Sequence, residues 1–193
     1  MDEIDNETKE LLLKLARSSI EDEFINKHSE TNILKKKCSE FFPKKQGVFT
    51  TLKINNQLRG CIGYPEPVLP LCTAIINSAK SASFEDPRFP PLTKEELNKI
   101  NIEISVLTIP KRLDNSRQEL ASRIKIGRDG LIIRKGYYSG LLLPQVATEY
   151  NFNKIEFLEQ TCLKAGLNKD CWKEKETNIY SFSAIIFSEK DNK

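Results

Sequence analysis

A six-residue segment, Leu58-Arg59-Gly60-Cys61-Ile62-Gly63, combines a thiol, a guanidinium and two glycines. The glycines leave the backbone around the thiol unobstructed, so that its N–H groups are within reach of a ligand. In an extended strand, side chains two positions apart share a face, which places Arg59 beside Cys61. A guanidinium near a thiol favours the thiolate, the form that attacks carbonyl carbons or binds metals. Cys61 is therefore a candidate nucleophile, and the N–H groups of Gly60 and Gly63 are a candidate cradle for an oxyanion or phosphate.

Cys61 has a second interpretation, as a small buried hydrophobic residue. Free cysteines are among the most buried residue types, and a nucleophilic cysteine normally has a base beside it. The one histidine, His28, lies in a polar stretch between Lys27 and Ser29, and we assign it no role. The segment thus indicates a site more clearly than it identifies a reaction.

A second segment, residues 83–92, holds Asp86 and Arg88 among three prolines. Because proline restricts the backbone, these two charges are expected in a fixed loop. Arg88 is then a candidate to join Arg59 in binding an anion, and Asp86 is the one evident acid or base for chemistry at the thiol. The alternative is local: Asp86 caps a turn and Arg88 pairs with it or with a neighbouring glutamate.

Hydrophobic spacing predicts the elements that position these segments. A helix over residues 11–24 and another over 69–81 should cover a hairpin of strands 48–54 and 57–62, joined at Asn55-Asn56. Thr93 to Glu96 matches a capping box, which predicts a short helix. Further along the chain we expect a strand over 101–109 and a meander of three strands over 124–126, 131–134 and 138–143. Two helices over 144–150 and 153–166 should follow, and a final strand over 179–187 should join the first sheet.

Composition narrows the class of protein. The 193 residues carry 30 basic and 27 acidic side chains, and a balance of +3 is too small to indicate nucleic acid or a membrane surface as partner. Five cysteines at irregular separations, without a C-x-x-C pair and with one histidine, argue against a metal site and are expected to be free thiols. An acidic start without an apolar leader and the lack of a membrane-length apolar run predict a cytoplasmic protein.

Six segments together resemble the AMMECR domain family, over residues 8–187. The six segments are 47–52, 58–63, 86–92, 104–107, 126–131 and 143–147. The hexapeptide with Cys61, residues 58–63, is the segment most specific for this family. The resemblance implies an α/β protein of the α+β type with two unequal lobes. Each lobe would have an antiparallel sheet and flanking helices. A cleft would separate the lobes, and the side chains of the hexapeptide would face it. Residues 1–110 with 176–193 would form the larger lobe, and residues 111–175 the smaller. It also implies Memo-like and radical-SAM proteins as partners, and it supplies no established activity and no cofactor.

Three functions are therefore weighed. The first is a cleft that binds a small anionic ligand, with Arg59 and Arg88 as the binding groups and Cys61 as a possible catalyst. The second is a module that binds a ligand or a partner without chemistry. The third, RNA binding, is disfavoured: Gly60 to Gly63 matches the GxxG of KH domains, but that loop lies between helices and carries a basic residue, whereas this one is apolar and ends a strand.

Overall fold

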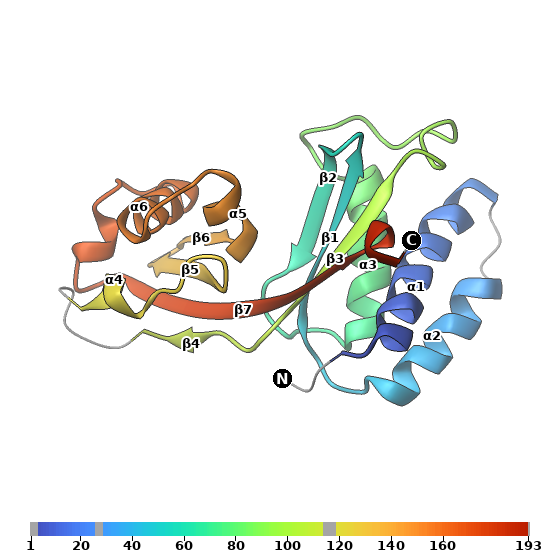
Figure 1. Ribbon diagram of the computed structural model, residues 1–193, viewed down its shortest axis with the longest axis horizontal. Coiled ribbons are helices and arrows are strands. Elements are labelled where there is room, and N and C mark those ends of the chain that lie inside the picture. Colours follow the sequence, from blue (N-terminus) through green and yellow to red (C-terminus); the bar gives the residue numbers. More distant parts are fainter. Residues whose placement is uncertain (1–3, 26–28, 114–118, 193) are drawn as a thin grey trace. The chain divides into compact units, whose positions relative to one another are not determined.

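A computed structural model of the chain describes residues 4–25, 29–113 and 119–192. The chain forms two compact units (Figure 1). Unit 1 consists of Met1–Leu107 and Ile185–Lys193, and unit 2 of Thr108–Ala184. Each unit has its own hydrophobic core, so each is described separately.

Unit 1 is a layered arrangement of helices on one face of an antiparallel sheet. Helix α3 packs against the two hairpin strands, and α1 packs against α3 with α2 beside it (Figure 1). The buried face of the sheet presents β-branched and leucine side chains at alternate positions, as a half-buried strand requires. The elements are α1 (Asn6–Ile25), α2 (Ser29–Phe41), β1 (Gly47–Ile54), β2 (Gln57–Tyr64), α3 (Leu71–Phe84), β3 (Asn101–Leu107) and the 3-10 helix η2 (Glu189–Asn192).

The predicted hairpin is confirmed. Strands β1 and β2 pair antiparallel across Asn55 and Asn56, whose φ angles are 52° and 64°. Positive φ at both central residues is the geometry of the tight hairpin turn that asparagine tolerates. The strand order β2-β1-β3 makes β2, the strand with Cys61, an edge of the sheet.

Unit 2 is a second antiparallel arrangement with its own helices. Strand β5 pairs with β6 and with β7, and β4 pairs with the other edge of β7. Strand β7 belongs to both units, because its residues from Ile185 onward group with unit 1, where β3 is its neighbour. The elements are β4 (Lys111–Arg112), α4 (Leu120–Arg123), β5 (Asp129–Lys135), β6 (Tyr138–Leu142), α5 (Pro144–Glu149), α6 (Lys154–Lys164), the 3-10 helix η1 (Cys171–Lys173) and β7 (Asn178–Ser188).

Several expected elements differ from those observed. Helix α2 was not predicted, because its buried stripe is thin: Thr31, Leu34 and Cys38 face inward between lysines. The meander has two strands instead of three, because residues 124–126 lead into a turn in which Asp129 accepts a hydrogen bond from the Lys125 N–H at 2.9 Å. The region of His28 lies outside the described residues. In the described part of the chain, no helix is long and apolar enough to span a bilayer.

The expectation of five free thiols was wrong. Cys38 in α2 forms a disulfide with Cys72 in α3, and Cys162 in α6 forms one with Cys171 in η1. Each bridge lies within one unit, and the bridged cysteines are separated by 34 residues in unit 1 and by 9 residues in unit 2. Irregular cysteine spacing did not reveal these pairs, because spacing alone does not determine connectivity. Cys61 is the free cysteine.

Candidate functional site

A β-bulge directs Arg59 away from Cys61. The β1–β2 register shifts between Leu52 and Lys53: Gly60 lies opposite Leu52 and Leu58 opposite Lys53, so Arg59 is the extra residue. The guanidinium of Arg59 therefore pairs with Glu96 instead of lying beside the thiol. The sequence expectation, which assumed regular alternation along the strand, is corrected by this bulge.

The Arg59–Glu96 ion pair joins the edge strand to the turns after α3. Arg59 Nε and Nη2 donate to the two carboxylate oxygens of Glu96, each at 2.9 Å, and the Arg59 side chain is only 11% exposed. Glu96 also accepts from the Thr93 N–H at 2.9 Å, which is the hydrogen bond expected of a capping box. These hydrogen bonds to Arg59 lower the pKa of Glu96 to about 2. The predicted short helix is replaced by consecutive turns over residues 94–99.

Gly60 lies against helix α3. A Cβ atom at this position would stand 2.1 Å from the carbonyl oxygen of Ala82. The glycine therefore permits close packing of the strand on the helix backbone. A side chain at position 60 would point toward α3, so this position belongs to the face of the strand opposite to the Cys61 thiol.

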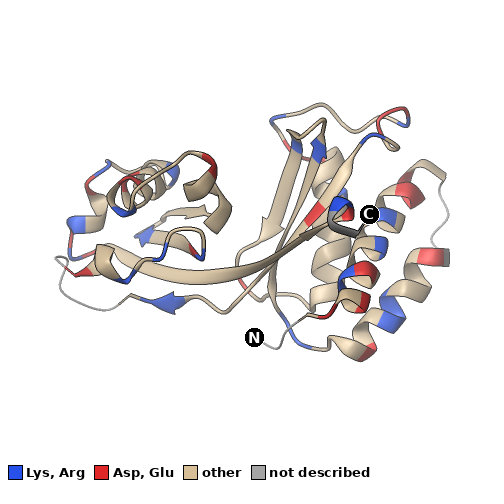
Figure 2. Cartoon of the chain, viewed as in Figure 1, with Lys and Arg blue, Asp and Glu red and all other residues tan. Residues whose placement is uncertain are grey.

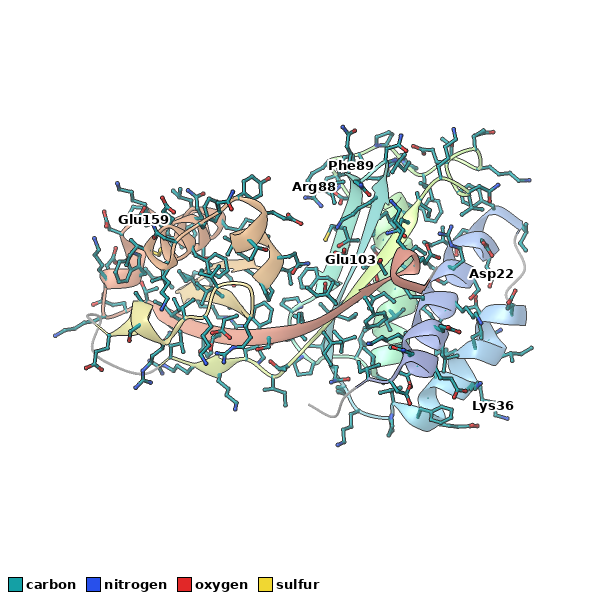
Figure 3. The ribbon with its side chains drawn as sticks, in the orientation of Figure 1. Asp22, Lys36, Arg88, Phe89, Glu103 and Glu159 are labelled. Atoms are coloured by element: carbon teal, nitrogen blue, oxygen red, sulfur yellow. A yellow bond between two sulfur atoms is a disulfide. The ribbon has the colours of Figure 1, made fainter. Side chains whose placement is uncertain are left out.

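Asp86 and Arg88 together cap the sheet edge at Cys61. The Asp86 carboxylate accepts from the Cys61 N–H at 2.8 Å, and Arg88 Nη2 donates to the Cys61 carbonyl oxygen at 3.0 Å. Arg88 also donates to both oxygens of Asp86, from Nε at 2.9 Å and from Nη2 at 2.7 Å. The ion pair thus replaces the neighbouring strand that an edge strand lacks. Figure 3 shows Arg88 next to Phe89 in the loop that follows α3.

Asp86 is held as an ionised group. Its side chain is 2% exposed, and its hydrogen bonds to Arg88, with those to the N–H groups of Cys61 and Arg88, lower its pKa to about 2. A carboxylate in this state stays ionised at neutral pH and is a weak base. The geometry therefore favours a positioning role for Asp86 over the acid–base role that the sequence suggested.

The Cys61 thiol is partly buried and lies beside Thr51. The Thr51 hydroxyl donates to the sulfur at 3.2 Å. Burial raises the pKa of the Cys61 thiol, and the Thr51 hydrogen bond and the Arg88 charge only partly offset this effect. The expected shift toward thiolate is therefore wrong, because desolvation outweighs the nearby guanidinium.

Phe89 connects the two guanidinium groups. Its ring centroid lies 5.9 Å from the Cζ of Arg59 and 5.6 Å from the Cζ of Arg88, within the range of cation–π contacts. Arg59 Nη1 is buried and has no hydrogen-bond partner among the described residues. The ring and the carboxylates thus make Arg59 part of the scaffold, whereas the Arg88 side chain is 49% exposed.

Gly63 presents backbone groups on the same edge as Cys61. Hydrogen-bonding groups alternate along an antiparallel strand, so Gly63, two residues after Cys61, directs its N–H and C=O away from β1. A Cβ at Gly63 would lie 2.3 Å from the Val48 carbonyl oxygen, which explains the glycine. Among the six candidate residues, Cys61, Gly63 and Arg88 therefore lie at the sheet edge, where Asp86 binds Cys61 and Arg88. Arg59 and Gly60 face the scaffold instead.

Sequence reasoning missed Glu96, Phe89 and Thr51. Glu96 was seen only as part of a capping box, and its second role depends on a contact 37 residues away in sequence. Thr51 could have been found from the hairpin register, because it lies directly opposite Cys61. No group of three or more His, Cys, Asp or Glu side chains in the described ranges is placed to hold a metal ion.

The two depressed carboxylate pKa values predict an acid-sensitive unit 1. Glu96 and Asp86 stay ionised in the folded state down to a pKa of about 2, but in the unfolded chain they take up protons near their ordinary values of 4.5 and 3.8. The unfolded state therefore binds more protons, and stability should fall as pH decreases from about 5 toward 2. Urea unfolding at pH 6, 4 and 3 measures this loss. The Glu96→Gln variant should lose less stability over the same range, and an unchanged acid dependence in this variant would contradict the assignment.

The cysteine chemistry predicts one free thiol of low reactivity. Unfolding the oxidised protein in denaturant without reductant should release one titratable thiol per chain, and five after reduction. In the native protein Cys61 should react with iodoacetamide at pH 7 more slowly than a free cysteine, because burial raises the pKa of its thiol. Five thiols without reductant, or a rate above that of free cysteine, would contradict these assignments.

The fold and this edge define an α/β protein in which an antiparallel sheet carries a Leu-Arg-Gly-Cys-Ile-Gly strand clamped by an Asp-x-Arg loop. A family model described as AMMECR1 matches residues 13–187. A protein of Aquifex aeolicus is 54% identical over 154 residues, with 79% of each chain covered, and one of Pyrococcus furiosus is 47% identical over 192 residues, covering 97% of this chain and 90% of that one. The crystal structure of an uncharacterised protein from Pyrococcus horikoshii matches with a TM-score of 0.87 and 42% identity, covering 97% of this chain and 94% of that one. The chain belongs to the AMMECR1 family.

Proposed function

We propose that unit 1 binds a small anionic group, a carboxylate or a phosphate, at the Arg88 guanidinium beside Cys61, and that it does so without covalent chemistry at the thiol. The observation that carries this proposal is the fixed, half-exposed fork of Arg88. Three hydrogen bonds from Nε and Nη2 orient the guanidinium, and none of the described contacts involves Nη1. A guanidinium already held in one orientation loses little conformational freedom when an anion binds.

Charge balance predicts a directional site of modest affinity. Asp86 already neutralises Arg88, and Glu96 neutralises Arg59, so no large positive potential attracts anions from a distance. Binding then depends on the outward N–H groups of Arg88 and on the edge N–H of Gly63. An oxyanion with several acceptor oxygens uses these donors better than a halide does.

An enzymatic role for Cys61 has less support. The pKa of the thiol is raised, the pKa of Asp86 is about 2, and no described residue is placed as a base for the sulfur. Nucleophilic catalysis requires an activated thiolate. We therefore assign Cys61 the role of a backbone anchor whose N–H and C=O fix the Asp86–Arg88 pair.

A partner protein is a second source of the same ligand chemistry. Arg88 and Asp86 occupy the hydrogen-bonding groups of Cys61, so a partner strand is blocked from adding to the sheet at this residue. A carboxylate side chain or a C-terminal carboxylate of a Memo-like or radical-SAM protein would instead meet the exposed Arg88 fork. This partner class comes from the family resemblance, and the anion chemistry comes from the site.

Isothermal titration calorimetry with inorganic phosphate and with oxalate at low ionic strength tests the proposal. The native protein should give saturable binding of at least one of them, and Arg88→Gln should weaken it at least about tenfold, because a charge-assisted hydrogen bond is lost. Cys61→Ser should leave the affinity within about twofold. Arg128→Gln is the matched control, since Arg128 and Asp129 form a similar half-exposed bidentate pair in unit 2. Equal binding by the Arg88 variant, lost binding in the Cys61 variant, or no saturable binding would overturn the proposal.

A further inference from the structure

A polar pocket of unit 1 lies apart from the residues of the Arg88 site. Helix α1 contributes Arg17 and Glu21 to its lining, the segment 98–101 contributes four residues, and η2 contributes Glu189 and Lys190. Its volume of about 430 Å³ is within the range of small-molecule sites. Figure 2 shows basic and acidic residues together where η2 lies near α1.

Two of the residues that line this pocket form an ion pair. Arg17 Nε and Nη2 donate to the two oxygens of Glu189 at 2.9 and 2.6 Å, and Arg17 also donates to the carbonyl oxygens of Leu97 and Ile100 at 2.7 and 3.0 Å. Glu189 accepts a further hydrogen bond from the Ile102 N–H at 2.9 Å. Arg17 and Glu189 therefore cancel each other in charge and are already committed to the scaffold.

The other polar side chains of the pocket are available to a ligand. Among the described residues, Glu21 and Lys99 form no close ion pair, although the charge of Arg17 acts on Glu21 and that of Lys99 acts on Glu95 and Glu96. The side chains of Asn98 and Asn101 form no hydrogen bond in the same part of the chain. Lys190 donates to the Asn56 side-chain oxygen at 2.8 Å, which leaves two of its three N–H groups. A concave site lined by polar side chains with unused hydrogen-bonding capacity suits a small polar ligand.

The free charges divide into an acidic and a basic part. Burial raises the pKa of Glu21, and the carboxylates of Glu30, Glu189 and Asp22 raise it further, against the lowering effect of Arg17. Lys99 and Lys190 are not among the charges that act on Glu21. An ammonium group is therefore favoured beside Glu21, and carboxylates are favoured beside the two lysines.

We infer that this pocket binds a small amino dicarboxylate, whose ammonium group meets Glu21 and whose two carboxylates meet Lys99 and Lys190. The carboxylate of Glu21 and the ammonium groups of Lys99 and Lys190 are opposite in charge to the three ionised groups of such a ligand. The two asparagine side chains supply hydrogen bonds that a simple dicarboxylate uses less completely. The inference is independent of the Arg88 site, since the residues that line the two sites do not overlap.

The test uses the full chain and three probes in isothermal titration calorimetry. L-Glutamate carries the complete set of charges, glutarate lacks the ammonium group, and γ-aminobutyrate lacks one carboxylate. L-Glutamate should bind saturably, and glutarate and γ-aminobutyrate at least about tenfold more weakly, because each loses a charge-assisted hydrogen bond. In Glu21→Gln the preference for L-glutamate over glutarate should disappear, and in Lys99→Gln the affinity for L-glutamate should fall about three- to tenfold.

Two exposed residues outside the lining of the pocket provide matched controls. Glu10 lies on α1, and Lys94 lies in the turns that precede Lys99, and neither lines the pocket. Glu10→Gln and Lys94→Gln should bind L-glutamate as the native protein does. Equal binding of glutarate, unchanged binding in both pocket variants, or no saturable binding of L-glutamate would overturn the inference. An Arg88→Gln variant that no longer binds L-glutamate would place the ligand at the edge-strand site instead.

Discussion

Gly60→Ala should destabilise unit 1 by about 3 kcal/mol or more, because a methyl group cannot be accommodated between strand and helix. The added Cβ would lie 2.1 Å from the Ala82 carbonyl oxygen, and this atom belongs to the backbone of α3, so no side-chain rotation relieves the clash. The strand or the helix must move, and both contribute residues to the core of unit 1. Urea unfolding of the purified variant, or its loss from the soluble fraction, measures the effect.

Gly136→Ala is the control for this substitution. Gly136 has a φ of 57° in the turn between β5 and β6, and an added Cβ meets nothing within 4 Å. The cost there is the conformational strain alone, about 1 kcal/mol. If Gly60→Ala cost no more than Gly136→Ala, the close contact between β2 and α3 would be refuted.

Glu96→Ala should destabilise unit 1 by about 2–4 kcal/mol, because it leaves the Arg59 guanidinium buried without its counterion. The lost partner accepted two hydrogen bonds of 2.9 Å from a side chain that is almost enclosed. Denaturant unfolding monitored by circular dichroism at pH 7 measures the change. The exposed neighbour Glu95 is not the ion-pair partner of Arg59, and Glu95→Ala should change stability by less than about 0.5 kcal/mol.

A double variant distinguishes the effect of losing the ion pair from the effect of leaving one buried charge unpaired. Arg59→Leu combined with Glu96→Leu removes both charges, so it should cost less than Glu96→Ala alone, since no unpaired charge remains. A double variant that is less stable than the single one would show that packing, and not charge compensation, determines the role of Arg59.

Local pattern was sufficient to predict the hairpin and both site segments. Alternating apolar residues, the Asn55-Asn56 turn and the prolines around Asp86 act over a few positions, and the observed β1, β2 and loop agree with them. The local alternative for the loop, an Asp86–Arg88 ion pair, is also observed. The structure adds that this pair bonds to the Cys61 backbone 25 and 27 residues earlier in the chain.

The features that sequence could not supply depend on long-range contacts. One unpaired residue in β2 changed the direction of Arg59, and a bulge has no distinct composition. The pKa of Cys61 depends on burial that only the fold determines. Likewise, cysteine spacing does not show that Cys38 meets Cys72, because α2 itself has too few apolar residues to be recognised.

The most direct test of the Arg88 site is a titration of isotopically labelled protein with inorganic phosphate, followed by ¹H–¹⁵N NMR. We predict that the Arg88 Nε–H, the Gly63 amide and the Cys61 amide signals shift together along one saturable curve, because these groups share the sheet edge. Signals that shift elsewhere while these three stay fixed would contradict the account.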